Sequence, residues 1–207
     1  MGEAVKVEAD VMRQHHAVEA LLDSQQSDQA VSSLKTKQLM VGRASALLAR
    51  TLGMEMALAT DIGHAARLKD IGLTCLPPMI SNSPHGLNPA ELVLYRQHPV
   101  QGARLLSLYD GPFFQLAAMI CLYAHERVDG SGWPSGTHGR LIPLEAKIVS
   151  VASAYVELRL GVQHASHQQA MTILTCGDED HTPEQFDDRV LWALVEAGSR
   201  LGHIVPQ

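Results

Sequence analysis

The sequence has little of several features that define common protein classes. Its 207 residues include only three cysteines, Cys75, Cys121 and Cys176, which lie far apart and form no C-x-x-C pair. This usage argues against a disulfide scaffold and fits buried thiols in a reducing compartment. No apolar run is long enough to span a bilayer, and residues 1–10 lack the pattern of a secretory signal. We therefore expect a cytoplasmic protein without a membrane segment.

Basic residues and strand signals are also scarce. Sixteen Lys and Arg stand against 22 Asp and Glu, which gives a formal net charge of −6. Because the charges form no long block of one sign, neither a nucleic acid nor an anionic membrane is an expected partner. Aromatic residues make up 4% of the chain, and alternation of apolar and polar residues is rare. These features predict an all-α fold.

Helical periodicity is what the sequence has in abundance. Apolar residues recur at spacings of three and four, and proline and glycine mark the boundaries. A breaker-rich stretch, residues 74–87, is expected to be a loop. The expected helices cover residues 37–52, 55–69, 88–109, 113–126 and 143–160, with a last helix capped by residues 182–185 and ending near residue 202.

The chain is expected to divide into two unequal parts. Residues 1–33 are polar and rich in Gln and Ser near their end, and they predict an N-terminal helix with a linker. Residues 34–207 form the main helical domain. Whether the N-terminal helix pairs two chains into a homodimer is left open by its weak amphipathicity.

Three short stretches contain side chains suited to chemistry. Asp70 lies in RLKDIG, His98 in RQHPVQG and His125 in YAHERVDGSGWPSG. Each has an ordinary interpretation when taken alone: a capping acid, a packed or exposed histidine, and a tight glycine turn.

The order and spacing of these stretches resemble a known family. LKDIG, RQHPVQGARLL and HERVDGSGWPSGTHGRLIPLEAKI follow one another as in the HD-GYP group of metal-dependent HD phosphohydrolases, over about residues 37–157. The resemblance implies an HD-type helical bundle whose histidines and aspartates hold two or three divalent metals. In that family the metals activate water to cut cyclic di-GMP. Imidazole and carboxylate ligands suit iron, manganese or zinc.

Part of the family's ligand set is kept. Asp70 matches the aspartate of the HD pair, His98 the histidine before proline, and His125 the second histidine of HHE. A single weakly held divalent ion on these three residues is one interpretation, because two histidines and one aspartate make a workable ligand set. The other is that the pocket holds no metal.

Other ligand positions of the family are replaced. Lys69 stands where the HD histidine is expected, Ala124 at the first histidine of HHE and Ser153 at the aspartate of VAD; by a looser alignment, Lys37 replaces a fourth histidine. Alanine cannot ligate, and an ammonium repels a divalent cation. We therefore hypothesise that Lys69, and with it Lys37, pairs with Asp70 where a metal would lie. The alternative is that Lys69 turns outward to solvent.

The glycine-rich loop is kept better than the ligand set. Trp133 stands where the family usually has tyrosine. The resemblance implies contacts of this loop with diguanylate cyclase (GGDEF) domains, whereas a purely structural role in joining two core helices is an equal competitor. The matching residues are Glu126, Arg127, Asp129, Gly130, Gly132, Trp133 and Pro134.

Two functions from different classes follow. The first is a degenerate HD-GYP domain that acts in bacterial cyclic di-GMP signalling as a regulatory or binding module, through a GGDEF domain, another signalling protein or the nucleotide itself. The second is an active cyclic di-GMP phosphodiesterase with a reduced metal site. A fold remnant in a structural protein is a third interpretation, which predicts no nucleotide binding.

Overall fold

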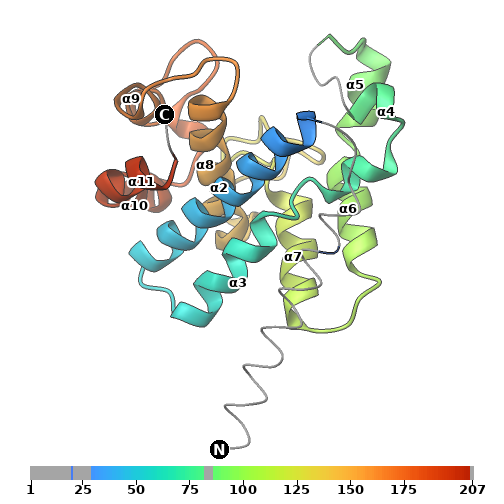
Figure 1. Ribbon diagram of the computed structural model, residues 1–207, viewed down its shortest axis with the longest axis horizontal. Coiled ribbons are helices and arrows are strands. Elements are labelled where there is room, and N and C mark those ends of the chain that lie inside the picture. Colours follow the sequence, from blue (N-terminus) through green and yellow to red (C-terminus); the bar gives the residue numbers. More distant parts are fainter. Residues whose placement is uncertain (1–19, 21–28, 82–85, 206–207) are drawn as a thin grey trace, which may run out of the picture.

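The computed structural model describes residue 20, residues 29–81 and residues 86–205, and every regular element in them is helical (Figure 1). The all-α prediction is therefore confirmed. The helix and linker predicted for residues 1–33 lie largely outside the described residues, although α2 already begins at Gln29. The α-helices are α2 (Gln29–Thr51), α3 (Met56–Ala66), α4 (Pro78–Ser81), α5 (Pro89–Tyr95), α6 (His98–Leu106), α7 (Pro112–Tyr123), α8 (Leu144–Leu160), α9 (His167–Cys176), α10 (Asp188–Glu196) and α11 (Gly198–Ile204).

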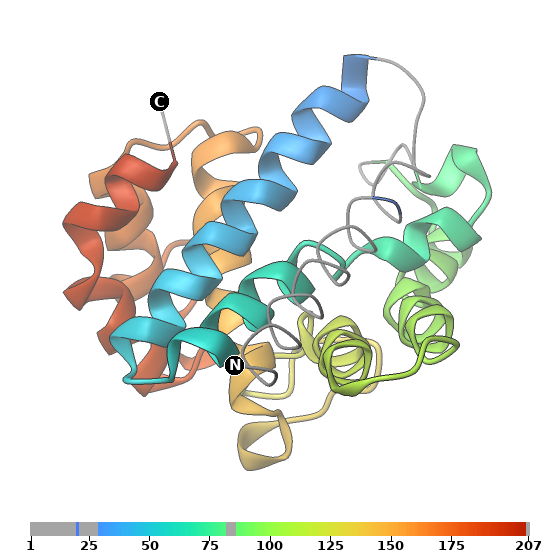
Figure 2. The same cartoon turned by 60° about the horizontal axis from the view of Figure 1, so that its bottom comes forward.

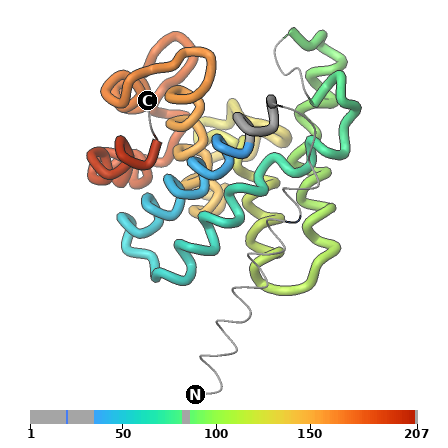
Figure 3. The backbone as a smooth tube through the Cα atoms, viewed as in Figure 1, coloured from blue at the N-terminus to red at the C-terminus, as the bar shows by residue number. Residues whose placement is uncertain are grey.

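The long helix α2 organises the bundle. It packs against α3, α8, α10 and α11, while α6 packs against α7 and the 3-10 turn Ile71–Cys75. Figure 2 shows the C-terminal helices α9 to α11 on one side of α2 and helices α4 to α6 on the other. The backbone tube in Figure 3 follows the same path from the α2–α3 pair outward to α4 and α5 and back through α7. None of the helices in the described ranges has the length and apolarity needed to cross a membrane.

The core fills the space between α2, α3, α7, α8 and α10. It is built from aliphatic residues and alanine, which fits the low aromatic content, and Tyr155 is its largest fully buried side chain. Other residues without solvent exposure are Leu48, Ile62, Leu68, Leu106, Ile120, Ile148, Leu174, Leu194 and Leu201.

The helix predicted over residues 88–109 is in fact two helices, α5 and α6. The predicted start is correct, because the Asn88 side chain accepts hydrogen bonds from the backbone of Ala90 and Glu91 in a capping box. The break comes at Arg96–Gln97 because Pro99 has no N–H to continue the helix. The carbonyl of Tyr95 is thereby left without its usual backbone donor.

Other predictions of secondary structure also needed correction. The helix before the glycine loop ends at Tyr123, so His125 lies beyond it. Residues Pro183–Gln185 form only a 3-10 turn, and the following helix is capped by Asp187 instead. The predicted loop over residues 74–87 contains the short helix α4. Helix α9 was not predicted, although its capping box, with Ser166 at the N-cap, is visible in the sequence.

Candidate functional site

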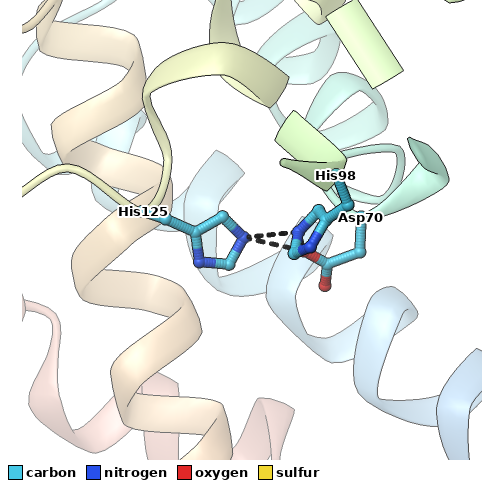
Figure 4. A group of neighbouring side chains, drawn as sticks. All are labelled: Asp70, His98 and His125. Atoms are coloured by element: carbon cyan, nitrogen blue, oxygen red, sulfur yellow. Dashed lines mark hydrogen bonds and ion pairs between the residues drawn. The ribbon is translucent and has the colours of Figure 1, made fainter. Parts of the chain in front are cut away.

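Three side chains from three separate segments meet in one cluster (Figure 4). Asp70 lies four residues after α3, His98 is the first residue of α6, and His125 lies two residues beyond α7. One ligating atom of each lies within 4.8 Å of the others. The structure thus brings together the three residues that the sequence singled out as remaining ligands. We call them the Asp-His-His cluster.

The three ligating atoms form a nearly equilateral triangle. His125 Nε2 lies 2.9 Å from Asp70 Oδ1, and His98 Nε2 lies 3.3 Å from the same oxygen. The two Nε2 atoms are 3.2 Å apart. His98 is fully buried, whereas the side chains of Asp70 and His125 are each 20% exposed. The cluster is therefore reachable from solvent on the side of Asp70 and His125.

The orientation of His98 follows from the break between α5 and α6. Its Nδ1 lies 2.9 Å from the carbonyl oxygen of Tyr95, the group that Pro99 leaves without a helical donor. A carbonyl can only accept, so Nδ1 carries the proton. With Nδ1 bonded to this carbonyl, Nε2 is the atom of His98 that could bind an ion beside Asp70 and His125, which is the arrangement that a ligating histidine needs.

Close backbone packing holds His98 beside Asp70. A Cβ placed on Gly72 would lie 1.9 Å from the carbonyl oxygen of His98 and 2.5 Å from the amide nitrogen of Gly102. Only glycine lets the 3-10 turn after Asp70 approach the first turn of α6 so closely. The DIG sequence therefore supplies both one residue of the cluster, Asp70, and the space in which the next one, His98, approaches it.

Lys69 turns into the cluster and not outward. Its ammonium forms an ion pair with Asp70 Oδ2, and its side chain is only 12% exposed. The pairing predicted for Lys69 is therefore confirmed. Asp70 Oδ1 faces the Nε2 atoms of His125 and His98, and Oδ2 is paired with Lys69, so the two carboxylate oxygens have different neighbours.

The pKa values follow from these contacts. Burial opposes the ionisation of Asp70, but the charge of Lys69 and hydrogen bonds with His125 and His98 hold its pKa well below the ordinary value. Burial, reinforced by the charge of Lys69, lowers the pKa of His125 to about 4. His125 is thus neutral at pH 7, and its Nε2 donates to Asp70 Oδ1.

Aromatic rings cover the histidines of the cluster. The Trp133 ring stacks on His125 with a centroid distance of 4.1 Å and an interplanar angle of 15°, and it meets His98 edge-on at 5.2 Å. Tyr95 lies 5.1 Å from His98 and 6.1 Å from Trp133. Burial, together with the charges of Asp70 and Glu157, raises the pKa of Tyr95 to about 12, so its hydroxyl stays protonated.

The glycine-rich loop folds back on the end of α7 and so positions Trp133. The amide of Trp133 donates to the carbonyl of His125, and the amide of Ser135 donates to Glu126 Oε1. A Cβ on Gly132 would lie 2.3 Å from the amide nitrogen of Arg127. Gly130 has a φ of +86°. The glycines are therefore needed where the loop turns and where it touches the preceding backbone.

Side chains of the same loop tie it to the C-terminal half. The Arg127 guanidinium donates to Ser150 Oγ on α8 and lies over the ring of Phe186. Asp129 Oδ1 accepts from both the amide and the hydroxyl of Ser131. These contacts account for Arg127 and Asp129 as structural residues of the loop.

The remaining replaced positions lie outside the cluster. Lys37 forms an ion pair of 3.0 Å with Glu157 and joins α2 to α8, so the prediction that it pairs with Asp70 is wrong. Ala124 is buried at the end of α7. Ser153 is half-buried on α8, one turn before Glu157. Within the described residues, only Asp70, His98 and His125 form a group able to hold a metal.

The cluster fits one divalent ion. Bonds of about 2.0–2.2 Å from an ion to nitrogen and oxygen place neighbouring ligand atoms about 3.0–3.5 Å apart. The observed separations of 3.2 and 3.3 Å lie within this range, and the third, 2.9 Å, lies just below it. Two histidines and one carboxylate with open positions beside them form a set that suits iron(II) and related ions.

Two residues of the site were not singled out from the sequence. Tyr95 holds His98 through its backbone, and its ring contacts Trp133. The signal was the proline four residues later, whose effect on the Tyr95 carbonyl can be read from the sequence. Glu157 was not identified because its pairing with Lys37 joins positions 120 residues apart.

Comparisons with known proteins agree with this geometry. The family described as HD domain matches residues 18–184. The chain is 42% identical over 115 residues to a Thermotoga maritima protein named cyclic di-GMP phosphodiesterase, covering 56% of this chain and 31% of that protein. It is 38% identical over 161 residues to the cyclic di-GMP phosphodiesterase response regulator RpfG of Xanthomonas campestris, covering 78% and 42%. The chain therefore spans less than half the length of either relative.

A solved structure shows the same fold. An HDGYP protein from Bdellovibrio bacteriovorus superposes with a TM-score of 0.63 at 20% identity, over 91% of this chain and 58% of that chain. The HD domain model, which matches residues 18–184, places this protein in the HD domain family. The relatives and the kept loop place it more closely: the chain belongs to the HD-GYP family.

Proposed function

We propose that this chain is a binding or regulatory module of cyclic di-GMP signalling and that it lacks the multi-metal hydrolytic activity of its family. The metal-dependent hydrolysis of a phosphodiester uses clustered ions to generate hydroxide and to neutralise the phosphate. Within the described residues the ligand cluster has three members. That number suffices for one ion and not for two.

The ion pair of Lys69 with Asp70 is the observation that carries the proposal. It occupies the second oxygen of the cluster's carboxylate with a side chain that cannot ligate while it is charged. Ala124 and Ser153 add no replacement ligand of comparable strength. An active phosphodiesterase with a reduced, one-metal site is the competing function, and the intact Asp-His-His cluster is what favours it.

Restoring the family's residues distinguishes the two. A variant with Lys69→His, Ala124→His and Ser153→Asp is expected to bind a second metal ion and to hydrolyse cyclic di-GMP with added Mn²⁺, whereas the parent chain does neither. Metal content is measured by elemental analysis and turnover by chromatography of the nucleotide. Hydrolysis by the parent at a rate similar to the variant would refute the proposal.

The loop around Trp133 is the proposed contact surface for the nucleotide or for a GGDEF domain. Its indole covers the cluster and remains partly accessible, so a bound base or a docked loop would stack against it. We expect Trp133→Ala to weaken cyclic di-GMP binding by about tenfold or more. Trp192→Ala, an exposed tryptophan on α10, is the matched control and should bind as the parent does. Equal loss in both variants, or in neither, would argue against this surface.

A further inference from the structure

We infer that the ammonium of Lys69 acts as a built-in cation beside the Asp-His-His cluster. This charge limits the cluster to a single divalent ion and lowers the affinity for that ion. The inference deepens the proposed function and rests on it, because it says how this chain departs from a multi-metal centre. It concerns a lysine that stands where the family pattern has a ligating histidine.

The two oxygens of Asp70 have different neighbours. Oδ1 faces His98 Nε2 and His125 Nε2, and Oδ2 faces the ammonium of Lys69. A second ion on Oδ2 would need further ligands on that side of Asp70, where the described residues place the ammonium of Lys69. Because the ammonium already lies on Oδ2, only the triangle around Oδ1 is open to an ion.

The backbone of Lys69 is fixed from the neighbouring helix. The thiol of Cys121, on α7, donates to the Lys69 carbonyl at 3.1 Å, and Cys121 is fully buried. The Lys69 amide donates to the carbonyl of Ala66 in the turn after α3. The side chain starts from this fixed backbone and is 12% exposed, so its position on Asp70 is set by the fold.

The charges in the cluster predict a weak single site. Asp70 is the one carboxylate of the cluster among the described residues, and it is already paired with Lys69. An ion in the triangle therefore has one shared negative charge and a nearby ammonium that repels it. Removing the ammonium while keeping the length of the side chain should strengthen ion binding by about tenfold or more.

The test is a titration of the full chain with Mn²⁺ alone. Calorimetry measures the affinity, and elemental analysis measures the number of ions bound per chain. The parent is expected to bind one ion per chain. Lys69→Met should bind one ion about tenfold more tightly, whereas Lys69→Arg keeps the charge and should bind as weakly as the parent. Asp70→Asn should remove binding. Two ions on the parent, equal affinity of the methionine and arginine variants, or no ion on either parent or methionine variant would each overturn the inference.

Trp133 offers a second readout that does not depend on activity. Its ring stacks on His125, so an ion on that histidine should change the tryptophan emission. The background for this measurement is Trp192→Phe, which removes the exposed tryptophan of α10. In the Lys69→Met variant, which is expected to bind the ion more tightly, the emission change should saturate at one equivalent of Mn²⁺. Mn²⁺ binding without any emission change would place the ion elsewhere and contradict the inference.

The inference and the proposed function fail in different experiments. A parent chain that binds one ion and hydrolyses cyclic di-GMP would refute the proposed function and leave the role of Lys69 intact. A parent chain that binds two ions without hydrolysing the nucleotide would refute the role of Lys69 and leave the proposed function intact.

Discussion

Pro99 influences the Asp-His-His cluster although its own side chain is not one of the three that form it. It removes one backbone N–H, and the freed carbonyl of Tyr95 accepts a hydrogen bond from Nδ1 of His98 instead. The helix break thereby gives His98 a second contact, of the kind that commonly orients histidines that bind metals. Pro99 thus determines, through the Tyr95 carbonyl, which ring nitrogen of His98 carries a proton.

We predict that Pro99→Ala weakens Mn²⁺ binding while leaving the chain folded. Alanine would supply an N–H to the Tyr95 carbonyl and favour one continuous helix over α5 and α6, so His98 Nδ1 would lose its partner. Loss of such an orienting contact typically costs about 10–100-fold in metal affinity. Calorimetry measures the affinity, and circular dichroism should show equal or higher helicity.

Pro112→Ala is the matched control for this prediction. Pro112 also begins a helix, α7, but no histidine ring depends on the carbonyl it frees. The control should bind Mn²⁺ as the parent does. A similar loss in both proline variants would mean that general loosening of the bundle, and not the orientation of His98, explains the effect.

At the level of helices, the site depends on how closely two turns approach. Gly72 lies against the first turn of α6, and the space is too small for a Cβ atom. Gly72→Ala should lower the free energy of unfolding by about 1–3 kcal/mol, because α6 must move away from Asp70. It should also weaken Mn²⁺ binding.

Gly198→Ala provides the comparison for Gly72→Ala. Gly198 begins α11, and a Cβ there would meet only Met171 at an ordinary contact distance of 3.7 Å. Chemical denaturation should show no loss of stability, or a gain of up to about 1 kcal/mol. If Gly72→Ala proved as stable as Gly198→Ala, the close approach would not be what sets the cluster.

A buried ion pair joins α8 to the start of α10. Lys147 Nζ lies 3.0 Å from Asp187 Oδ2, and both side chains are nearly buried, at 8% and 12% exposed. Burial raises the pKa of Asp187, but hydrogen bonds and charge from Lys147 and Arg189 outweigh it and hold that pKa below 3.8. The folded state therefore keeps this carboxylate charged to a lower pH than the unfolded state does. Its contribution to stability is complete above pH 3.8 and is lost as the pH falls through the folded pKa.

Asp187→Asn tests this contribution while keeping an N-cap side chain. We expect it to lower the free energy of unfolding by about 1–3 kcal/mol at pH 7 in urea, because Lys147 is left without its charged partner. The difference from the parent should shrink as the pH falls below 3.8. Asp188→Asn, in the exposed first turn, should cost less than about 1 kcal/mol. A difference for Asp187→Asn that is constant with pH would exclude the ion pair as its cause.

For the whole molecule, the sequence predicted what depends on local pattern and motif spacing. It predicted the all-α class and the grouping of Asp70, His98 and His125, because the spacing of these residues follows a family pattern. It did not predict the division of residues 88–109, since a capping box specifies only where a helix begins. The partner of Lys37 could not be predicted because it depends on the packing of α2 against α8. From its chemistry, the Lys69 side chain could either pair with Asp70 or face solvent, and only the three-dimensional structure distinguishes the two.

The most direct test of the central claim is to measure metal content and cyclic di-GMP hydrolysis on the same preparation, with Mn²⁺ or Fe²⁺ added. The related Thermotoga maritima protein, named as a cyclic di-GMP phosphodiesterase, serves as the positive control for the assay. Our account predicts no more than one ion per chain and intact nucleotide. Two ions per chain together with turnover would contradict it.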